Sequence, residues 1–440
     1  MKPIYFLALV VIVLLLDACG DHRSNRTYTD SIYSTKGGKP KLSKKDTVAK
    51  AKNIFLPFDN VTHEDSFATK SSYKIALLLP FNIDSFYKDS TAIGYSAIPK
   101  GIYPALDFYE GTLIALDSLK KAGVHFDVQV VDYSSQRMAF NQIAGKYHLK
   151  DMDLLIGTLS SLDAKPVAEF AAENRITFVS PLANSYAPTH NPFYVSLNPS
   201  LYAQQQKLVG SILTCCGKNA RVLCLHPNSA NENAMATSIS TQLAKVEKNE
   251  FKINTINCQV KTPVDSIKRL LSKTRPNVLI ISSNESSYVY PIIRKLNELA
   301  DSFSISVFGL PSWNSFENLK TIASKRLKIY YTNTYFVDRA APAFLHFSRQ
   351  FVEHYKIKPS ELAIRGYSTM LACGLALDKH GVRFHYFMPK STKTLYGAIK
   401  LKPLYRLEEM NGRHYTQHFQ NAIISLVKIE SNSVIRISGE

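Results

Sequence analysis

The sequence predicts an α/β protein with two doubly wound parallel sheets side by side. Short runs of Leu, Ile and Val occur without alternation, as parallel strands covered on both faces require. Amphipathic stretches separate these runs, which predicts a regular strand–helix alternation. There are too many such units for one modest sheet, so two sheets are the more economical arrangement.

The predicted elements begin near residue 72. Strands are expected at Lys74–Phe81, Val128–Asp132, Asp153–Gly157, Thr177–Ser180, Arg221–His226, Val278–Ser283, Ser306–Leu310 and Lys328–Thr332. Ala105–Ala122 and Ala340–Tyr355 repeat apolar residues at helical spacing, which predicts helices with one buried face. Open parallel sheets bind ligands at the carboxyl ends of their strands. The loops of interest are therefore 81–84, 158–161, 181–185, 226–231, 283–288, 311–314 and 333–336.

The N-terminus predicts export from the cytoplasm. Lys2 precedes an apolar run, Ile4–Leu16, that suits a signal peptide and is too short to cross a bilayer. With Cys19 after it, the segment resembles a bacterial lipoprotein signal, although Asp17 departs from the small neutral residue usual there. The resemblance implies removal of residues 1–18, diacylation of Cys19 and a bacterial membrane anchor on the periplasmic side. A signal without lipidation is the alternative.

Composition describes an ordinary globular protein with a basic surface. Of the 440 residues, 45% are hydrophobic and 20% charged, and the net charge is +18. Such a surface suits anionic lipid or glycan phosphates, whereas nucleic acid is not expected outside the cytoplasm. Residues 19–71 form a polar, Lys-rich tether, which either lies on anionic lipid or keeps the folded part away from the membrane.

The motifs of enzymes, metal sites and cofactor sites are not found in the sequence. It contains no GxSxG, HExxH or phosphate-binding loop, and its His and Cys residues do not follow zinc spacing. We expect no catalysis, no metal and no cofactor. Five cysteines besides Cys19 are too few and too scattered for a disulfide framework.

Several segments resemble the type I periplasmic binding proteins, in particular the branched-chain amino-acid receptors. The matching segments are Leu155–Ser161, Pro166–Glu173, Phe178–Ala183, Phe193–Asn198 and Ile364–Tyr367. The resemblance implies one lobe of residues 72–198 and 337–402 and another of 199–336 and 403–440. Hinge crossings are expected near Asn198, Asn333 and Leu404.

Five polar or small positions of the first lobe are candidate ligand contacts. Ser160 and Ser161 open a helix directly after a strand, so hydroxyls and backbone N–H groups there would hold a carboxylate. Each also fits an ordinary helix N-cap. The resemblance implies further contacts at Ala183 and Asn184, and an acid for an α-amino group where Asn198 stands.

The second lobe offers three more candidates. Asn231 stands where the resemblance implies an aromatic residue, and Glu285 would supply the missing acid from a neighbouring loop. Without such a carboxylate an ammonium group would be desolvated without a counter-charge, which makes a free amino acid doubtful as the ligand. Trp313, the single tryptophan, would either stack on a sugar or apolar ligand or pack beneath a loop.

Two functions fit the sequence. The first is a lipid-anchored solute-binding protein that captures a small polar or amphipathic molecule, such as an amino acid or peptide, for an ABC transporter permease. The second is an outer-membrane lipoprotein that regulates a penicillin-binding protein through protein contacts, since activators of these cell-wall synthases use a similar two-lobed domain. Gly20 after the lipidated cysteine favours the outer membrane.

Overall fold

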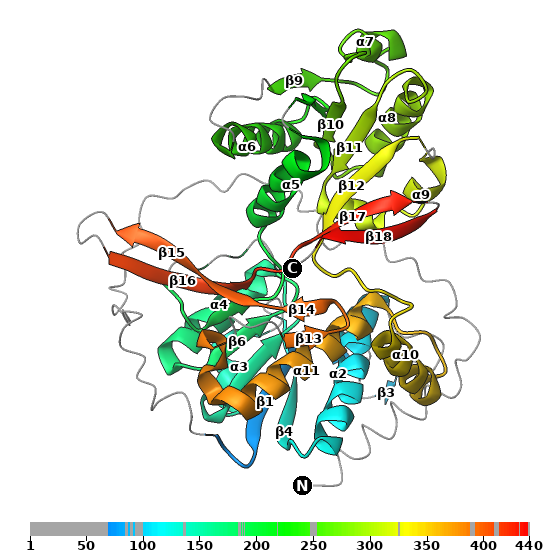
Figure 1. The fold of residues 1–440 in the computed structure, drawn as a ribbon. Coiled ribbons are helices and arrows are strands. Elements are labelled where there is room, and N and C mark those ends of the chain that lie inside the picture. The colour runs from blue at the N-terminus through cyan, green and yellow to red at the C-terminus, as the bar shows by residue number, and fades with distance from the viewer. Residues whose placement is uncertain are drawn as a thin grey trace. The chain divides into compact units, whose positions relative to one another are not determined.

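The described part of the chain folds into two compact units, one of residues 69–198 and 337–422, the other of residues 199–336 and 423–438 (Figure 1). The structure is a computed structural model that describes residues 69–438, with gaps at 84–86, 89–90, 93–99, 135–137, 184–185, 187, 189, 218, 247–252, 324–325, 388–391, 409–412 and 431. The signal, Cys19 and the tether as far as residue 68 lie outside the described residues. None of the helices described is long and apolar enough to cross a membrane.

Unit 1 is built on a seven-stranded sheet in the order β15-β16-β7-β6-β5-β1-β4. Its strands are β1 (Tyr73–Leu79), β4 (Phe126–Asp132), β5 (Leu154–Gly157), β6 (Thr177–Ser180), β7 (Tyr194–Ser196), β15 (Leu401–Glu408) and β16 (Arg413–Asn421). The pairs from β4 to β7 are parallel, and β15 runs antiparallel to β16. Small ribbons, β2 (Tyr87–Lys88) with β3 (Thr91–Ala92) and β13 (Thr392–Thr394) with β14 (Gly397–Ile399), complete the strands of this unit.

Helices cover the sheet of unit 1. They are α2 (Tyr103–Lys121), α3 (Phe140–Lys146), α4 (Ser161–Asn174), α10 (Pro342–Tyr355) and α11 (Glu361–His380), with short 3-10 turns at Lys100–Ile102, Leu149–Asp151 and Gly381–Tyr386. Gly123 lies two residues beyond the end of α2, where the chain turns away from the helix. Its φ is +85°, a conformation that glycine adopts without strain. Ser360 caps α11 by accepting a hydrogen bond from the backbone N–H of Ala363 at 3.1 Å.

Unit 2 is built on a second seven-stranded sheet in the order β18-β17-β12-β11-β10-β8-β9. Its strands are β8 (Arg221–His226), β9 (Ile253–Asn257), β10 (Asn277–Ile281), β11 (Ile305–Gly309), β12 (Lys328–Asn333), β17 (Ser425–Glu430) and β18 (Ser433–Ser438). Its helices are α5 (Leu201–Cys216), α6 (Ala230–Val246), α7 (Val264–Lys268), α8 (Ser286–Leu299) and α9 (Leu319–Ile322), with a 3-10 turn at Pro311–Ser315. Strands β9, β8, β10, β11 and β12 pair in parallel. Strand β17 pairs antiparallel with β12, and β18 pairs antiparallel with β17.

The predicted fold class is confirmed, because two parallel-dominated sheets with flanking helices form from the expected apolar runs. Strands β1, β5, β8 and β10 have almost fully buried side chains, as runs without alternation predicted. Each of the eight predicted strands overlaps an observed one. The sequence analysis missed β9, the four strands of the small ribbons and the four C-terminal strands, which are either very short or richer in polar residues.

One predicted boundary is wrong. The chain was expected to enter the second lobe at residue 403, near a crossing at Leu404, but residues 401–422 belong to unit 1. The reason is the hairpin of β15 and β16, which pairs from Leu401↔Asn421 to Glu408↔Arg413 and joins the sheet through Phe419↔Val195. The chain therefore leaves unit 1 after Ala422, as the return to β17 requires.

Candidate functional site

The carboxyl edge of the unit 1 sheet is where the strands β1, β4, β5, β6 and β7 end. Beyond β1 the chain is tied to β4, because the Asp132 carboxylate accepts hydrogen bonds from the backbone N–H groups of Asn82 and Ile83 at 2.9 and 2.8 Å. Asn82 adopts φ of +52°, which turns the backbone toward this carboxylate. This acid is therefore engaged in shaping the edge.

Ser160 and Ser161 lie at the start of α4, as expected. The Ser160 Oγ accepts a hydrogen bond from the Asp163 N–H at 3.2 Å and donates one to the Asp163 carboxylate at 2.7 Å. Ser160 is thus an N-cap, and the Asp163 carboxylate already occupies the positive end of the helix. Ser161 is the first helical residue, and the next residue, Leu162, is 84% exposed. Whether Ser161 contacts a ligand stays a prediction.

Replacing Ser160 by alanine is expected to lower the unfolding free energy by about 1 kcal/mol, because both the cap and the hydroxyl donor to Asp163 are lost. Chemical denaturation without ligand measures this change. Ser348→Ala, on α10 of the same unit, is the matched control and should stay within about 0.5 kcal/mol of the parent. Equal stability of the two variants would contradict the capping role.

Ala183 and Asn198 lie just beyond the carboxyl ends of the neighbouring strands β6 and β7, respectively. Asn198 is 8% exposed, and its Nδ2 donates to the Leu182 carbonyl at 2.9 Å. The Ser196 hydroxyl has two carbonyl acceptors, Asn198 at 2.8 Å and Ala183 at 3.3 Å. Ala183 is buried as well. These contacts give Asn198 a structural role, because its side chain holds the chain segment that follows β6. Asn184 lies outside the described residues.

Thr158, which the sequence analysis did not single out, lies between β5 and the cap of α4. It is 7% exposed, and its Oγ1 has no hydrogen-bond partner within the described part of the chain. A buried hydroxyl without a partner costs free energy, so this position is a candidate for a ligand contact. The signal available in the sequence was its place directly after the strand.

Unit 2 has a buried carboxylate at the carboxyl edge of its sheet. Glu232, in the first turn of α6, is 9% exposed and accepts hydrogen bonds from the hydroxyls of Ser229, at 2.8 Å, and Ser283. Ser229 Oγ also accepts from the Glu232 N–H at 3.3 Å, as an N-cap serine does. The Ser-x-x-Glu pattern could have revealed this cap. The predicted candidate Asn231, one residue earlier, is exposed.

Glu285 is exposed and precedes the first turn of α8, where its backbone N–H donates to the Ser283 hydroxyl at 3.1 Å. Glu232 and Glu285 thus both lie beside Ser283. The structure brings these two acids to one edge, whereas the sequence analysis named only Glu285 as a counter-charge.

A row of amide and hydroxyl groups continues along this edge. Ser312 donates to the Asn284 side chain at 2.7 Å, and the Asn333 side chain donates to that of Asn314 at 2.8 Å. The Asn333 Oδ1 in turn accepts from the Tyr335 N–H at 2.8 Å. These side chains come from the loop after β10, the 3-10 turn Pro311–Ser315 and the end of β12, so no local sequence motif predicted the row.

Trp313 belongs to the core of unit 2, and its proposed stacking on a ligand is withdrawn. The side chain is 1% exposed, its Nε1 donates to the Ser283 carbonyl at 3.1 Å, and its ring stacks on Phe316. A Cβ at Gly309 would lie 2.2 Å from the ring, so only glycine leaves room there. The alternative given from the sequence, packing beneath a loop, describes its position.

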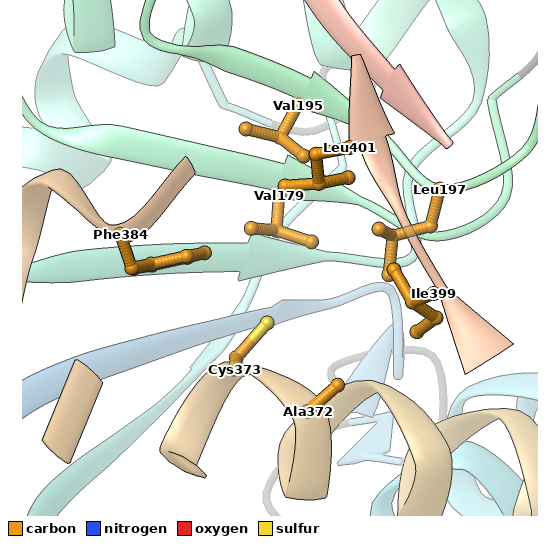
Figure 2. A pocket seen from close by; sticks show the side chains of 8 residues that line it. All are labelled: Val179, Val195, Leu197, Ala372, Cys373, Phe384, Ile399 and Leu401. Carbon is orange, nitrogen blue, oxygen red and sulfur yellow. The ribbon is translucent and has the colours of Figure 1, made fainter. Parts of the chain in front are cut away.

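The cavity shown in Figure 2 is not a ligand site. It lies in unit 1 and is lined only by apolar side chains: Val179, Val195, Leu197, Ala372, Cys373, Phe384, Ile399 and Leu401. Its free space of about 10 Å³ holds one water at most. Burial raises the pKa of the Cys373 thiol to about 12, so the thiol stays protonated at neutral pH.

The two carboxyl edges therefore offer hydroxyls, amides, helix N-termini and a few carboxylates. Among the described residues, no three His, Cys, Asp or Glu side chains are grouped as a metal ion would require. Groups of this kind bind polar solutes through hydrogen bonds. Two doubly wound lobes with such edges define a two-lobed α/β binding protein.

Comparison with known proteins gives the family. The family described as periplasmic binding protein matches residues 105–385, more than half of the sequence. This chain belongs to the periplasmic binding protein family, so the predicted resemblance is confirmed. It is a family of extracytoplasmic solute-binding proteins and not of enzymes. No curated protein matches the sequence.

Solved structures share the fold at low sequence identity. A branched-chain amino acid ABC transporter protein from Rhodospirillum rubrum has a TM-score of 0.57 at 12% identity, over 83% of this chain and 99% of that one. An ABC transporter substrate-binding protein from Sphaerobacter thermophilus has 0.53 at 13%, over 84% and 97%. LpoA from Haemophilus influenzae has 0.53 at 10%, over 84% of this chain and 60% of that one.

Proposed function

We propose that this protein captures a small polar or amphipathic solute, such as an amino acid, a peptide or a related molecule, for an ABC-type transporter. The family match over residues 105–385 is the observation that carries this proposal. Candidate ligand contacts in unit 1 are Thr158 and Ser161 at the carboxyl edge of its sheet. Considered by itself, the carboxyl edge of the unit 2 sheet offers Ser283, Asn284, Ser312 and Asn314.

The proposal includes an anchor. Cys19, diacylated after removal of residues 1–18, would hold the protein at a membrane on the periplasmic side, with the outer membrane favoured by Gly20. The Lys-rich residues 19–71 would then connect the anchor to the folded units. This placement rests on the sequence pattern alone.

A thermal-shift screen of residues 19–440 against amino acids, peptides and sugars tests ligand capture. A ligand at 100 times its dissociation constant should stabilise the protein by about 2.7 kcal/mol. Ser161→Ala should weaken that ligand about tenfold, because one hydrogen bond to it is lost. Ser348→Ala on α10 is the control and should leave the affinity unchanged.

A ligand that binds Ser161→Ala as well as the parent would remove Ser161 from the site and leave the function in place. Silence across the whole panel would argue against solute capture. The two outcomes therefore separate the site from the function.

The second candidate, regulation of a penicillin-binding protein through protein contacts, is supported by the fold likeness to LpoA. Cross-linking in cells of the source organism, followed by mass spectrometry, distinguishes the two functions. A penicillin-binding protein as the main product, together with a silent ligand screen, would favour the regulator. A transporter permease as the main product would favour solute capture.

A further inference from the structure

The connection between β9 and β10 carries an unusual concentration of positive charge. Within residues 260–275, which we name the basic segment, there is one acid, Asp265, and five exposed basic residues: Lys261, Lys268, Arg269, Lys273 and Arg275. The segment includes the short helix α7, at the periphery of unit 2 (Figure 1). Like charges close together repel one another, and a bound anion would relieve this repulsion.

The fold holds the basic segment in place and turns its charges outward. Ile267 and Leu271 are 1% and 8% exposed, so this side of the segment is fixed in the core. The turn that follows is tied by Asn277, whose side chain accepts from the Ser272 N–H at 2.8 Å and donates to the Ser272 carbonyl at 2.9 Å. Lys273 and Arg275 are therefore presented on a fixed turn.

The five basic side chains have no acidic partner among the described residues. Arg269 donates only to the Ser266 hydroxyl, at 3.4 Å, and Asp265 forms no ion pair with the segment. Two other basic residues of unit 2 do have acidic partners, Arg326 with Asp301 and Lys428 with Glu430. The charges of the basic segment are thus free to meet an external anion.

An apolar side chain accompanies the charges. Val260, next to Lys261, is 43% exposed. Its backbone carbonyl accepts a hydrogen bond from the Lys295 ammonium, which also contacts the Thr262 carbonyl at 2.5 Å. Lys295, on α8, therefore fixes the backbone that presents Val260. Exposed apolar groups beside Lys and Arg are typical of surfaces that rest on a lipid headgroup layer.

We propose that the basic segment docks unit 2 on an anionic lipid bilayer, with its Lys and Arg side chains on lipid phosphates and Val260 at the boundary between the headgroups and the acyl chains. This role goes beyond solute capture and does not depend on it. A bilayer fits better than nucleic acid, because the family is extracytoplasmic. Several basic residues acting together give appreciable attraction, since each contributes near an anionic surface.

Vesicle sedimentation tests the proposal. Residues 19–440 with Cys19→Ser, which removes any acyl chain, are mixed with phosphatidylglycerol–phosphatidylcholine vesicles or with pure phosphatidylcholine vesicles. Binding is expected only to the anionic vesicles and should be lost between about 0.1 M and about 1 M salt. The triple change Lys268→Glu, Arg269→Glu, Lys273→Glu should weaken binding at least about tenfold.

A matched triple change controls for net charge and for the Lys-rich tether. Lys245→Glu, Lys320→Glu, Lys328→Glu alters exposed residues on α6, α9 and β12 of the same unit and should weaken binding less than about twofold. Replacing Lys268, Arg269 and Lys273 by Gln gives a milder test if the glutamate variant does not fold.

Three results would overturn docking on a bilayer. Equal losses in the two triple variants would assign the attraction to net charge. A parent protein that ignores anionic vesicles would remove the surface altogether. Soluble inorganic polyphosphate is the third case. If it displaces the protein from vesicles, and if its own binding is weakened by the triple change in the basic segment, the segment is a site for soluble polyanions and not a membrane contact.

Discussion

Alanine at Gly111 or Gly366 is expected to lower the unfolding free energy of unit 1 by at least about 3 kcal/mol, the upper range for overpacking. Gly111 lies in α2 and Gly366 in α11, two helices that run side by side (Figure 1). A Cβ at Gly111 would lie 1.8 Å from the Ala363 carbonyl oxygen, and one at Gly366 would lie 2.0 Å from that of Phe108. Both obstacles are backbone atoms, so no rotamer change relieves the clash and the helices must separate.

Far-UV circular dichroism during urea unfolding is the appropriate measurement, because the single tryptophan, Trp313, lies in unit 2 and does not report on these helices. Gly145→Ala in α3 is the matched control, since a Cβ there meets nothing within 4 Å. It should be neutral or slightly stabilising. An unchanged unfolding midpoint for Gly111→Ala would mean that α2 and α11 do not pack this closely.

The fold was largely predictable because the central strands of both sheets are buried on both faces. Residues such as Leu77, Leu78 and Ile280, each fully buried, form continuous apolar runs that the sequence displays directly. The antiparallel strands at the ends of the sheets carry no such signal. In β16 the apolar Phe419 stands between the polar residues His418 and Gln420, and the hairpin that β16 forms moved the last crossing from residue 403 to residue 423.

The candidate site was predictable only where one element defines it. Ser160 was found because a serine after a strand and before a helix is a local pattern, and the structure gives it the capping role that the same pattern allowed. The contact between Ser312 and Asn284 joins loops that are far apart in sequence, so only the fold reveals it. Trp313 illustrates the reverse case, because its position after a strand was correct while its burial depended on Gly309 and Phe316.

Acid is expected to destabilise unit 1 through a buried neutral histidine. His385 is 1% exposed. Thr177 Oγ1 donates to the Val382 carbonyl at 3.0 Å, so it accepts from the His385 Nδ1–H at 3.1 Å. The second ring nitrogen, Nε2, has no partner among the described residues and would carry the added proton without an acceptor. Burial, helped by the charge of Arg383, lowers the pKa of His385 to about 3.

The direction of the effect follows from proton uptake. Below a pH of about 6.5 the unfolded chain binds a proton at this histidine, whereas the folded protein does not until the pH approaches its own lowered pKa. The contribution of His385 to the unfolding free energy is therefore fully present above a pH of about 6.5. It falls by about 1.4 kcal/mol for each pH unit below that value. Between about pH 7.5 and about pH 4.5 the loss from His385 amounts to roughly 3 kcal/mol.

A second histidine acts in the same direction. His418 is 4% exposed, and burial lowers its pKa to about 4, although a hydrogen bond with the Pro188 backbone opposes this shift. Its contribution adds to that of His385 and levels off at a higher pH, because its folded-state pKa is higher. Both side chains lie in unit 1, so the destabilisation that these two histidines cause acts on this unit.

Urea unfolding at several pH values, followed by circular dichroism, measures the slope. His385→Phe should remove about one proton from the difference between the unfolded and folded states, since phenylalanine fits among Phe193, Phe384 and Phe419 and does not titrate. His354→Gln, at an exposed position on α10, is the control and should leave the slope unchanged. If His385→Phe kept the full acid sensitivity of the parent, this histidine would have to be solvated or charged in the folded protein.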